Sequence, residues 1–496
     1  MKKPLIEVLD KEVITIAKPH LGLILITGAT GYIGGRLVPL LVERGYKIRV
    51  LVRGNQDEYK RRWPEVEVVT GDTLKPETLE KLMQGVNTAY YLIHSLLHGP
   101  SVFETADIQS AKNFREAAVK ANIKHIIYLG GLGDTGTKLS RHLRSRSHVA
   151  EELDKSEIPV TILRAAIIIG SGSASYEMIE HLVKSLPFFI VPKWVNTRCQ
   201  PISIRDVLKY LIGVLEKEDV WGRKLDIGGN DIFTYKEMLE IFARVLNKKR
   251  IFIQIPINNI SIYSYIASLV TPVPENVCRC LLEGGRNDVV CIDNSIKSLI
   301  PFETIDYKTA ILLALTREEQ DRISTRWSDA YPPAHDLALK LDELSKPARY
   351  QYNYSLKSSK TPSELFKSIC KIGGKTGWFH TNWIWSLRGM LDRLLLGTGD
   401  SRRSVHISNL RVNDVIDFWR VEDIKQNESL LLRAEMKLHG KAWLQLTIKT
   451  EGNDCYISVS AFYQPNGFFG IMYWHTFLPF QNFIFNDLVR SIEKSA

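Results

Sequence analysis

The sequence predicts a doubly wound α/β domain with a parallel sheet over residues of about 20–340, followed by an α+β domain with a curved antiparallel sheet. In the first part, apolar runs of strand length alternate with helical segments, as in a parallel sheet that helices cover on both faces. A glycine-rich turn directly follows the first apolar run. Beyond about residue 345 the pattern changes to strands joined by short turns and a final helix. The 496 residues exceed what one core usually organises, so two domains are expected.

The first strand and the turn after it give the strongest local signal. Leu21–Ile26 is apolar, and Gly28, Gly31 and Gly34 follow it with the spacing G-x-x-G-x-x-G. Glycines at this spacing allow a tight turn, let a pyrophosphate approach backbone N–H groups, and let the next helix, expected over Tyr32–Arg44, pack closely on the strand. The context predicts a nucleotide site, whereas a glycine triplet alone would also fit an ordinary strand-to-helix turn.

Three further strand ends carry polar residues that suit a nucleotide. The second strand, "YKIRVLVRG", ends at Arg53, where a guanidinium suits the 2′-phosphate of NADP and an acidic residue would favour NAD. NADP is therefore expected, with NAD possible and a merely solvated arginine as the other interpretation. The third strand ends at Asp72 and Thr73, which fit either the adenine edge or a helix cap. The fourth places His94 and Ser95 at its carboxyl end, where the ligand crevice of an open sheet lies.

The order of these motifs resembles the NmrA-like branch of the short-chain dehydrogenase superfamily. The motifs are "TGATGYIG", the "GD" ending at Asp72, "IHSL" at residues 93–96 and the later "QPISIRDVLKYL". The resemblance spans residues of about 20–330 and implies a Rossmann fold that binds NAD(P). It also implies cofactor contacts from the residues of the glycine turn, which are Thr27, Gly28, Thr30, Gly31, Tyr32, Ile33 and Gly34.

The same resemblance exposes a gap in the catalytic machinery. Active relatives carry a Tyr that moves a proton at the substrate and a Lys one helical turn later. In the stretch "GGLGDTGTKLSRHLRSRSHVAEEL", before a sixth strand expected in "PVTILRAAIIIGSGS", the closest pair is His142 with Arg146. His142 could replace the Tyr as acid or base, because the unperturbed pKa of histidine is near neutral. Arg146 could hold ribose hydroxyls or phosphate but releases no proton. The alternatives are a plain arginine-rich helix face, or hydride transfer with a proton from elsewhere.

The region after residue 345 has its own pattern. A strand is expected in "RYQYNYSLKSS", helices begin near Thr361 and in "TGWFHTNWIWSLRGMLDRLLLG", four strands follow, and "LPFQNFIFNDLVRSIEKS" forms a final helix. This order resembles the helix-grip fold of START-like proteins and, more narrowly, an uncharacterised bacterial domain fused behind NmrA-like modules. The expected domains are residues 1–345, for NAD(P) and a small substrate lobe, and residues 346–496, for a hydrophobic ligand.

Composition limits the remaining function classes. The net charge of +10 is scattered, so it indicates a bias toward anionic ligands or peripheral contact with an anionic membrane, and no nucleic-acid motif is present. The six cysteines form neither a disulfide framework nor a metal-binding pattern, and a reducing cytoplasm is expected. The sequence predicts no transmembrane segment and does not indicate an oligomeric state.

These observations support three hypotheses. The first is an NADP-dependent oxidoreductase that acts on a small hydrophobic molecule such as a quinone, polyketide or isoprenoid. The second is an NADP sensor or scaffold without catalysis, which the missing Tyr and Lys favour. The third is a lipid-binding or lipid-transfer protein, against which the complete glycine motif and Arg53 argue.

Overall fold

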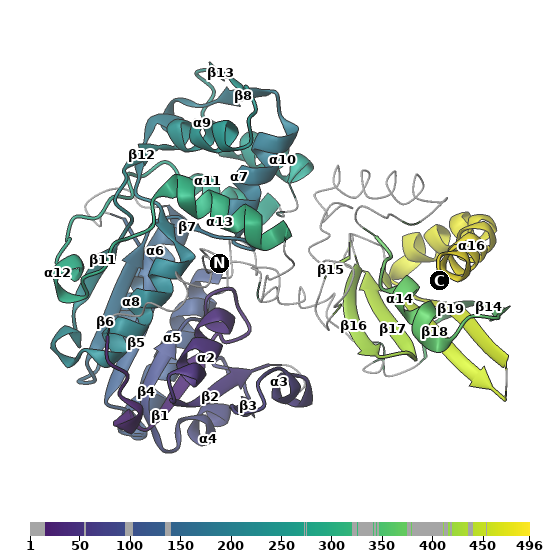
Figure 1. Ribbon diagram of the computed structural model, residues 1–496, viewed down its shortest axis with the longest axis horizontal. Helices are drawn as coiled ribbons and strands as arrows, with labels where there is room; N and C mark the ends of the chain where they lie inside the picture. Colours follow the sequence, from purple (N-terminus) through teal and green to yellow (C-terminus); the bar gives the residue numbers. More distant parts are fainter. Residues whose placement is uncertain are drawn as a thin grey trace, which may run out of the picture. The chain divides into compact units, whose positions relative to one another are not determined.

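The structure is a computed structural model. Contacts divide the chain into an N-terminal unit, Met1–Ala267 with Asn276–Tyr331, and a C-terminal unit, Ser268–Glu275 with Pro332–Ala496 (Figure 1). The structure describes residues 15–53, 56–94, 103–133, 140–271, 273, 275–319, 325, 341, 344, 347–373, 378, 410, 415–416, 419–434, 440–452 and 454–496.

A seven-stranded parallel sheet organises the N-terminal unit, with the strand order β11-β6-β5-β4-β1-β2-β3. The order reverses between β1 and β4, which creates the crevice where ligands of such sheets bind. The predicted parallel sheet is confirmed. Its strands are β1 (Leu23–Thr27), β2 (Lys47–Val52), β3 (Glu67–Thr70), β4 (Val86–Tyr91), β5 (His125–Gly131), β6 (Val160–Ala165) and β11 (Lys224–Ile227).

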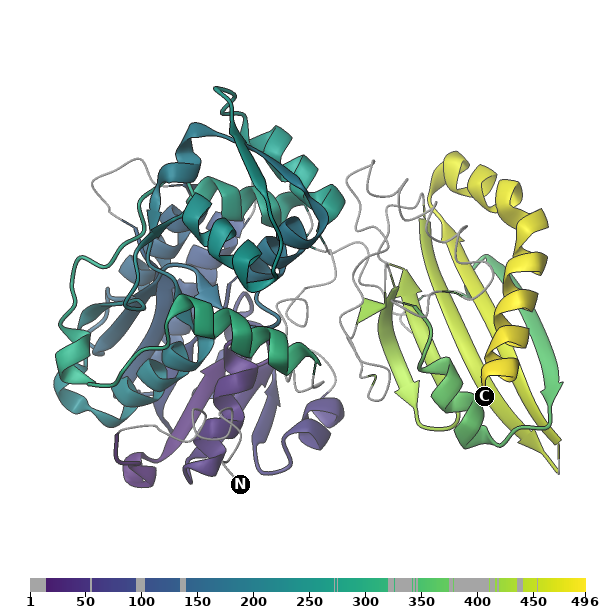
Figure 2. The ribbon, with the colours of Figure 1, turned by 45° about the horizontal axis from the view of Figure 1, so that its top comes forward.

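Helices cover both faces of this sheet, as the continuous apolar strands require (Figure 2). In β1, Ile24 and Ile26 are buried in the core that includes α2 (Gly34–Glu43) and α8 (Ile204–Glu216). Leu25 is buried in the core on the opposite face, because successive strand residues alternate in direction. That second core includes residues of α4 (Leu79–Met83), α5 (Phe103–Lys120) and α6 (Arg141–Leu153).

The sixth predicted strand is divided in the structure. β6 ends at Ala165, and Ile168–Ile169 form β7, which pairs with β10 (Ile202–Ser203) outside the main sheet.

The remaining elements of the unit are α3 (Gln56–Arg62), α7 (Ala174–Ser185), β8 (Phe188–Val191), β9 (Arg198–Cys199), β12 (Phe233–Thr234), α9 (Tyr235–Val245), β13 (Ile251–Gln254), α10 (Ile260–Val270), α11 (Glu275–Gly284), α12 (Ile296–Leu299), α13 (Tyr307–Glu319) and the short 3-10 helices Pro19–Leu21, Pro76–Thr78, Lys193–Asn196 and Glu218–Val220.

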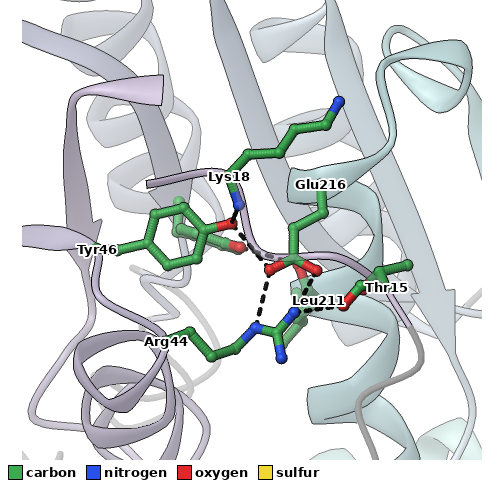
Figure 3. A network of polar contacts seen from close by, with 7 residues as sticks. Thr15, Lys18, Arg44, Tyr46, Leu211 and Glu216 are labelled. Carbon is green, nitrogen blue, oxygen red and sulfur yellow. Dashed lines mark hydrogen bonds and ion pairs between the residues drawn. The ribbon is translucent and has the colours of Figure 1, made fainter. Parts of the chain in front are cut away.

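A polar network joins the first βα unit to the end of α8 (Figure 3). The fully buried carboxylate of Glu216 accepts hydrogen bonds from Nε and Nη2 of Arg44, at 2.9 and 2.7 Å, and from the Tyr46 hydroxyl at 2.8 Å. The Tyr46 hydroxyl accepts from the backbone N–H of Lys18, and Arg44 also donates to the carbonyl of Thr15. The network therefore holds the segment before β1, the α2–β2 connection and α8 together.

The C-terminal unit contains a six-stranded antiparallel sheet in the order β14-β19-β18-β17-β16-β15. The predicted change to an antiparallel sheet is therefore confirmed. The predicted helix in residues 376–397 lies outside the described residues, apart from the buried Trp378. The elements are β14 (Tyr350–Ser358), α14 (Pro362–Ile369), β15 (Val415–Ile416), β16 (Trp419–Lys425), β17 (Ser429–Ala434), β18 (Gly440–Glu451), β19 (Asp454–Pro465) and α16 (Gly467–Ser495).

The final helix is longer than the sequence predicts. α16 begins at Gly467 and continues through Pro479, and Figure 2 shows that it bends along its length. Its last turns bury Leu488, Val489 and Ile492 in the core that also contains apolar residues of the sheet and α14. Among the described residues, no helix is both long and apolar enough to cross a membrane.

Candidate nucleotide-binding site

The glycine turn is held tightly against the end of β4. Gly28 has φ +70°, and a Cβ built there would lie 2.5 Å from the carbonyl oxygen of Leu92. A Cβ at Gly34 would lie 2.4 Å from the carbonyl oxygen of Gly28, whose oxygen also accepts from the N–H of Gly31. Side chains are excluded at both positions, so the turn places the start of α2 beside the residues that follow β4.

The start of α2 suits an anion. Its N-cap is the apolar Ile33, and no side chain caps its first turn. By contrast, hydroxyl side chains cap the starts of α6, α7, α8 and α9. In the first turn of α2 the N–H groups of Gly35 and Arg36 already donate to the carbonyls of Gly31 and Ile33. The helix dipole and the N–H groups of the turn that have no such acceptor are what a pyrophosphate uses in dinucleotide-binding folds. The residues present therefore fit a dinucleotide.

Most of the other turn residues have structural contacts. The Thr27 hydroxyl is buried and donates to the carbonyl of Tyr90, which ties β1 to β4. Thr30, Tyr32 and Ile33 are half-buried. The Arg36 guanidinium lies 4.6 Å from the centroid of the Tyr32 ring, so the tyrosine is held from the α2 side.

The adenosine side of the predicted site has one exposed cation. Arg53 directly follows β2 and is exposed, and no described residue pairs with its guanidinium. Asp72 accepts a hydrogen bond from the N–H of Leu74 at 3.0 Å, which closes a local turn. It caps no described helix, because the N-caps of the two helices that follow are Lys75 and Thr78, so the helix-cap interpretation is wrong. Thr73 is buried, where it accepts from the hydroxyl of Ser110. Arg53 is therefore an exposed positive charge at the carboxyl end of β2.

A histidine pair lies on the other side of the turn. His94 follows β4, and its ring centroid is 4.9 Å from that of His142, on α6. The Nδ1 atom of His94 lies 3.4 Å from the Asp107 carboxylate. No described residue makes a hydrogen bond with Nε2 of His94 or Nδ1 of His142. Two buried ring nitrogens are therefore without a hydrogen-bond partner among the described residues. Ser95 lies outside the described residues.

The electrostatics of the pair differ from those of a free histidine. Loss of water around the ring, with the nearby His94 and Arg146, lowers the pKa of His142 well below its ordinary value. Burial and Arg146 also lower the pKa of His94, although Asp107 opposes this effect. Both imidazoles are therefore uncharged at neutral pH. The expectation that His142 titrates near neutrality does not hold for the protein without ligand.

Arg146 has local partners. It donates to the carbonyl of Leu129 at 2.9 Å and lies 6.0 Å from the centroid of the Tyr128 ring. The absence of a side chain at Gly131 permits this approach, since a Cβ there would lie 3.0 Å from Leu143 and 3.4 Å from Arg146. Arg146 thus helps to fix α6 on β5. Among the described residues, no group of three or more metal-ligating side chains is placed to hold a metal ion.

Two features of the site are absent from the sequence-based prediction. The first is Asp107, which contacts His94 from α5. Asp107, Ser110 and Asn113 are polar residues at helical spacing on the buried side of α5, and this pattern could have indicated the contact. The second is Thr325, whose hydroxyl donates to the carbonyl of Tyr32 and whose methyl would meet a Cβ at Gly35 at 2.4 Å. No local pattern marks Thr325, because its partner is 293 residues away.

A parallel sheet with this order and a glycine turn at its switch point define a Rossmann-fold nucleotide-binding protein. The chain belongs to the NmrA-like family, whose model matches residues 21–283. The resemblance of the N-terminal region to that family is thus confirmed. Residues 344–488 match a family of proteins of unknown function, DUF2867.

Similar proteins match about half of this chain. Photosystem II assembly factor Ycf39 of Trieres chinensis is 23% identical over 247 residues, which are 49% of this chain and 75% of the relative. Ceramide reductase of Caulobacter vibrioides is 28% identical over 240 residues, 47% of this chain and 74% of the relative. Among solved structures, the Citrobacter sp. triphenylmethane reductase complexed with NADP(H) has a TM-score of 0.48 and 21% identity, and covers 58% of this chain and 99% of its own.

Proposed function

We propose that this protein binds NADP(H) in the N-terminal unit and acts as an oxidoreductase of the atypical short-chain dehydrogenase type. The observation that carries the proposal is the contact of the glycine turn with the end of β4. This contact places His94, which follows β4, and the neighbouring His142 beside the start of α2, which suits a pyrophosphate. Bound nicotinamide would supply or accept hydride, and the two histidines would position a polar group of the substrate through their unpartnered nitrogens.

The preference for NADP(H) over NAD(H) rests on Arg53. Its exposed guanidinium follows β2, where the ribose 2′ position of a dinucleotide lies in this fold class. A bidentate, permanently charged group binds a phosphate more strongly than a hydroxyl. The absence of a carboxylate at this position removes the usual partner of the NAD ribose.

Arg53→Ala should weaken NADPH binding about 10-fold to 100-fold, the range expected for one charge-assisted contact of about 1.5–3 kcal/mol. NADH binding should change less than about twofold, because NADH lacks the 2′-phosphate. Titration of nucleotide fluorescence measures both constants. Arg223→Ala is the matched control, since this exposed arginine precedes β11 at the opposite end of the sheet. Equal losses for both nucleotides would remove Arg53 from the specificity assignment.

We further infer a hydrophobic substrate, such as a quinone, polyketide or isoprenoid, with the C-terminal unit as a START-like helix-grip domain that holds it. The six-stranded sheet, its apolar core and the long α16 support this inference. The reduction named for one relative, the ceramide reductase, acts on an amphipathic lipid, which agrees with a substrate of this class. Oxidation of NADPH with a panel of quinones and ketones tests it.

A sensor or scaffold that binds NADP(H) without turnover is the second candidate. Arg146 is occupied by the Leu129 carbonyl and Tyr128, and His142 carries no proton to donate as an imidazolium at neutral pH. Tight NADPH binding without turnover across the panel would favour this candidate. Absence of nucleotide binding would contradict both and favour a lipid-binding protein.

The role of His142 has its own test. His142→Ala should abolish NADPH oxidation with any substrate that turns over, while NADPH binding stays within about threefold, if the imidazole supplies or orients the proton. His148→Ala is a matched control on the same helix, since His148 contacts Glu104 on the more exposed side. Turnover unchanged in His142→Ala, or lost equally in both variants, would exclude that role.

A further inference from the structure

The N-terminal unit carries an apolar surface outside the candidate site. β8 and β13 form a separate two-stranded parallel sheet, in which Phe188 pairs with Ile251 and Ile190 with Ile253. These four residues, the β8–β13 patch, are exposed by 58%, 56%, 57% and 49% respectively. Because strand residues alternate in direction, the pairs lie side by side on one face. The patch is therefore continuous.

On the opposite face of the same two strands, the side chains pack into the hydrophobic core. Phe189 and Phe252 stack with ring centroids 4.9 Å apart, and Phe189 and Val191 are buried. Figures 1 and 2 show β8 and β13 at the edge of the unit, beyond α9 and away from the seven-stranded sheet. The outward apolar residues are thus a projecting surface on a well-packed base. The exposed Ile257 extends it beyond the end of β13.

The chain segments that contain the patch carry positive charges and no acidic residue. Residues 181–205 and 241–274, which contain both strands, include no aspartate or glutamate. Beside the strands, Lys248 donates to the carbonyl of Lys184, and Arg250 donates to the carbonyls of Val183 and Lys184. Backbone carbonyls do not neutralise these cations. Lys193 and Lys249 are also exposed. Two cations of these segments pair with carboxylates from elsewhere in the chain, Lys184 with Glu180 and Arg198 with Asp288.

We propose that the β8–β13 patch docks the protein on the surface of an anionic lipid bilayer. Four large apolar side chains would enter the headgroup region, while the surrounding lysines and Arg250 contact lipid phosphates. A protein partner would need an acidic rim to match these cations, whereas an anionic bilayer offers phosphates at every position. The proposal does not depend on nucleotide binding or turnover.

The test is flotation of the full-length protein with vesicles of phosphatidylcholine alone or of phosphatidylcholine with 30% phosphatidylglycerol. One variant, Phe188→Ser with Ile253→Ser, removes apolar contacts, and Ile292→Ser, another exposed isoleucine, is its matched control. A second, Lys248→Ser with Lys249→Ser, removes charge, and its control is Lys120→Ser with Lys124→Ser, on and just after α5. Thermal unfolding by circular dichroism verifies that each variant folds.

The wild type should bind the anionic vesicles and not the neutral ones, with less binding as salt is raised. Each of the two double variants should lower the partition coefficient about 10-fold or more, because one removes apolar area that enters the headgroup region and the other removes two cations near the anionic surface. The control variants should bind like the wild type. Absence of binding, equal binding to both vesicles, or unchanged binding of the folded patch variants would overturn the proposal. Concentration-dependent self-association abolished by Phe188→Ser with Ile253→Ser, without lipid binding, would also overturn it and identify a protein contact.

Discussion

Glu216→Ala should lower the free energy of unfolding of the N-terminal unit by about 3–5 kcal/mol, the cost typical of removing one partner of a buried ion pair. The substitution leaves the largely buried Arg44 guanidinium without its carboxylate and the Tyr46 hydroxyl without its acceptor (Figure 3). It also weakens the attachment of the segment before β1, because the Lys18 N–H donates to the Tyr46 hydroxyl and the Thr15 carbonyl accepts from Arg44, and both side chains lose their contact with Glu216. Urea unfolding followed by tryptophan fluorescence and circular dichroism measures the effect on the transition of this unit.

The same region offers a matched control for that result. Glu218→Ala also removes a glutamate that pairs with a cation, but the Lys18–Glu218 bridge is exposed, with 61% of the glutamate side chain accessible. An exposed pair contributes about 0–1 kcal/mol, so this variant should unfold close to the wild type. Glu216→Gln separates charge from shape, because the amide can still accept from Tyr46. Equal stabilities of Glu216→Ala and Glu218→Ala would show that the network does not stabilise the unit.

Local signals were enough to predict the Rossmann sheet. The apolar run before Gly28 must be covered on both faces, and the glycine spacing allows one tight turn into a helix, so β1 and α2 follow from adjacent residues. β7 is different. Ile168–Ile169 have the same apolar character as β6, and only their pairing with β10, from residues more than thirty positions later, separates them from the main sheet.

The candidate site shows the same limit. The places of Gly28 and Gly34 in the tight turn, and of Arg53 at the exposed end of β2, could be predicted because they depend on the strand that precedes them. The environment of His142 could not, since its pKa is set by His94, on another element, and by water excluded in the fold. Arg36 is a further example, because the carbonyls that accept its hydrogen bonds belong to Ser171 and Thr325. Contacts between distant positions leave no periodic pattern.

Asp206→Asn should stabilise the N-terminal unit at pH 7 by about 1–3 kcal/mol. The Asp206 side chain is buried on α8, where one carboxylate oxygen accepts from the N–H of Ile305 at 2.8 Å and the other has no hydrogen-bond partner among the described residues. Burial raises the pKa of Asp206 from 3.8 to about 6, against opposing contributions from the Ile305 N–H, Lys209 and Arg205. An asparagine keeps the acceptor for Ile305 and carries no charge to desolvate.

The pH dependence distinguishes this cause from altered packing. Between pH 3.8 and about 6 the unfolded chain has released the Asp206 proton, whereas the folded chain retains it. Unfolding therefore releases a proton in that window, and the contribution of Asp206 to stability falls as pH rises through it, by about 3 kcal/mol in all. The advantage of Asp206→Asn should be near zero at pH 3.5, grow between pH 4 and 6, and remain constant above. Asp219→Asn, at an exposed aspartate paired with Lys217, should show neither the gain nor the trend. An advantage equal at pH 3.5 and pH 7 would mean that desolvation of the Asp206 carboxylate is not its source.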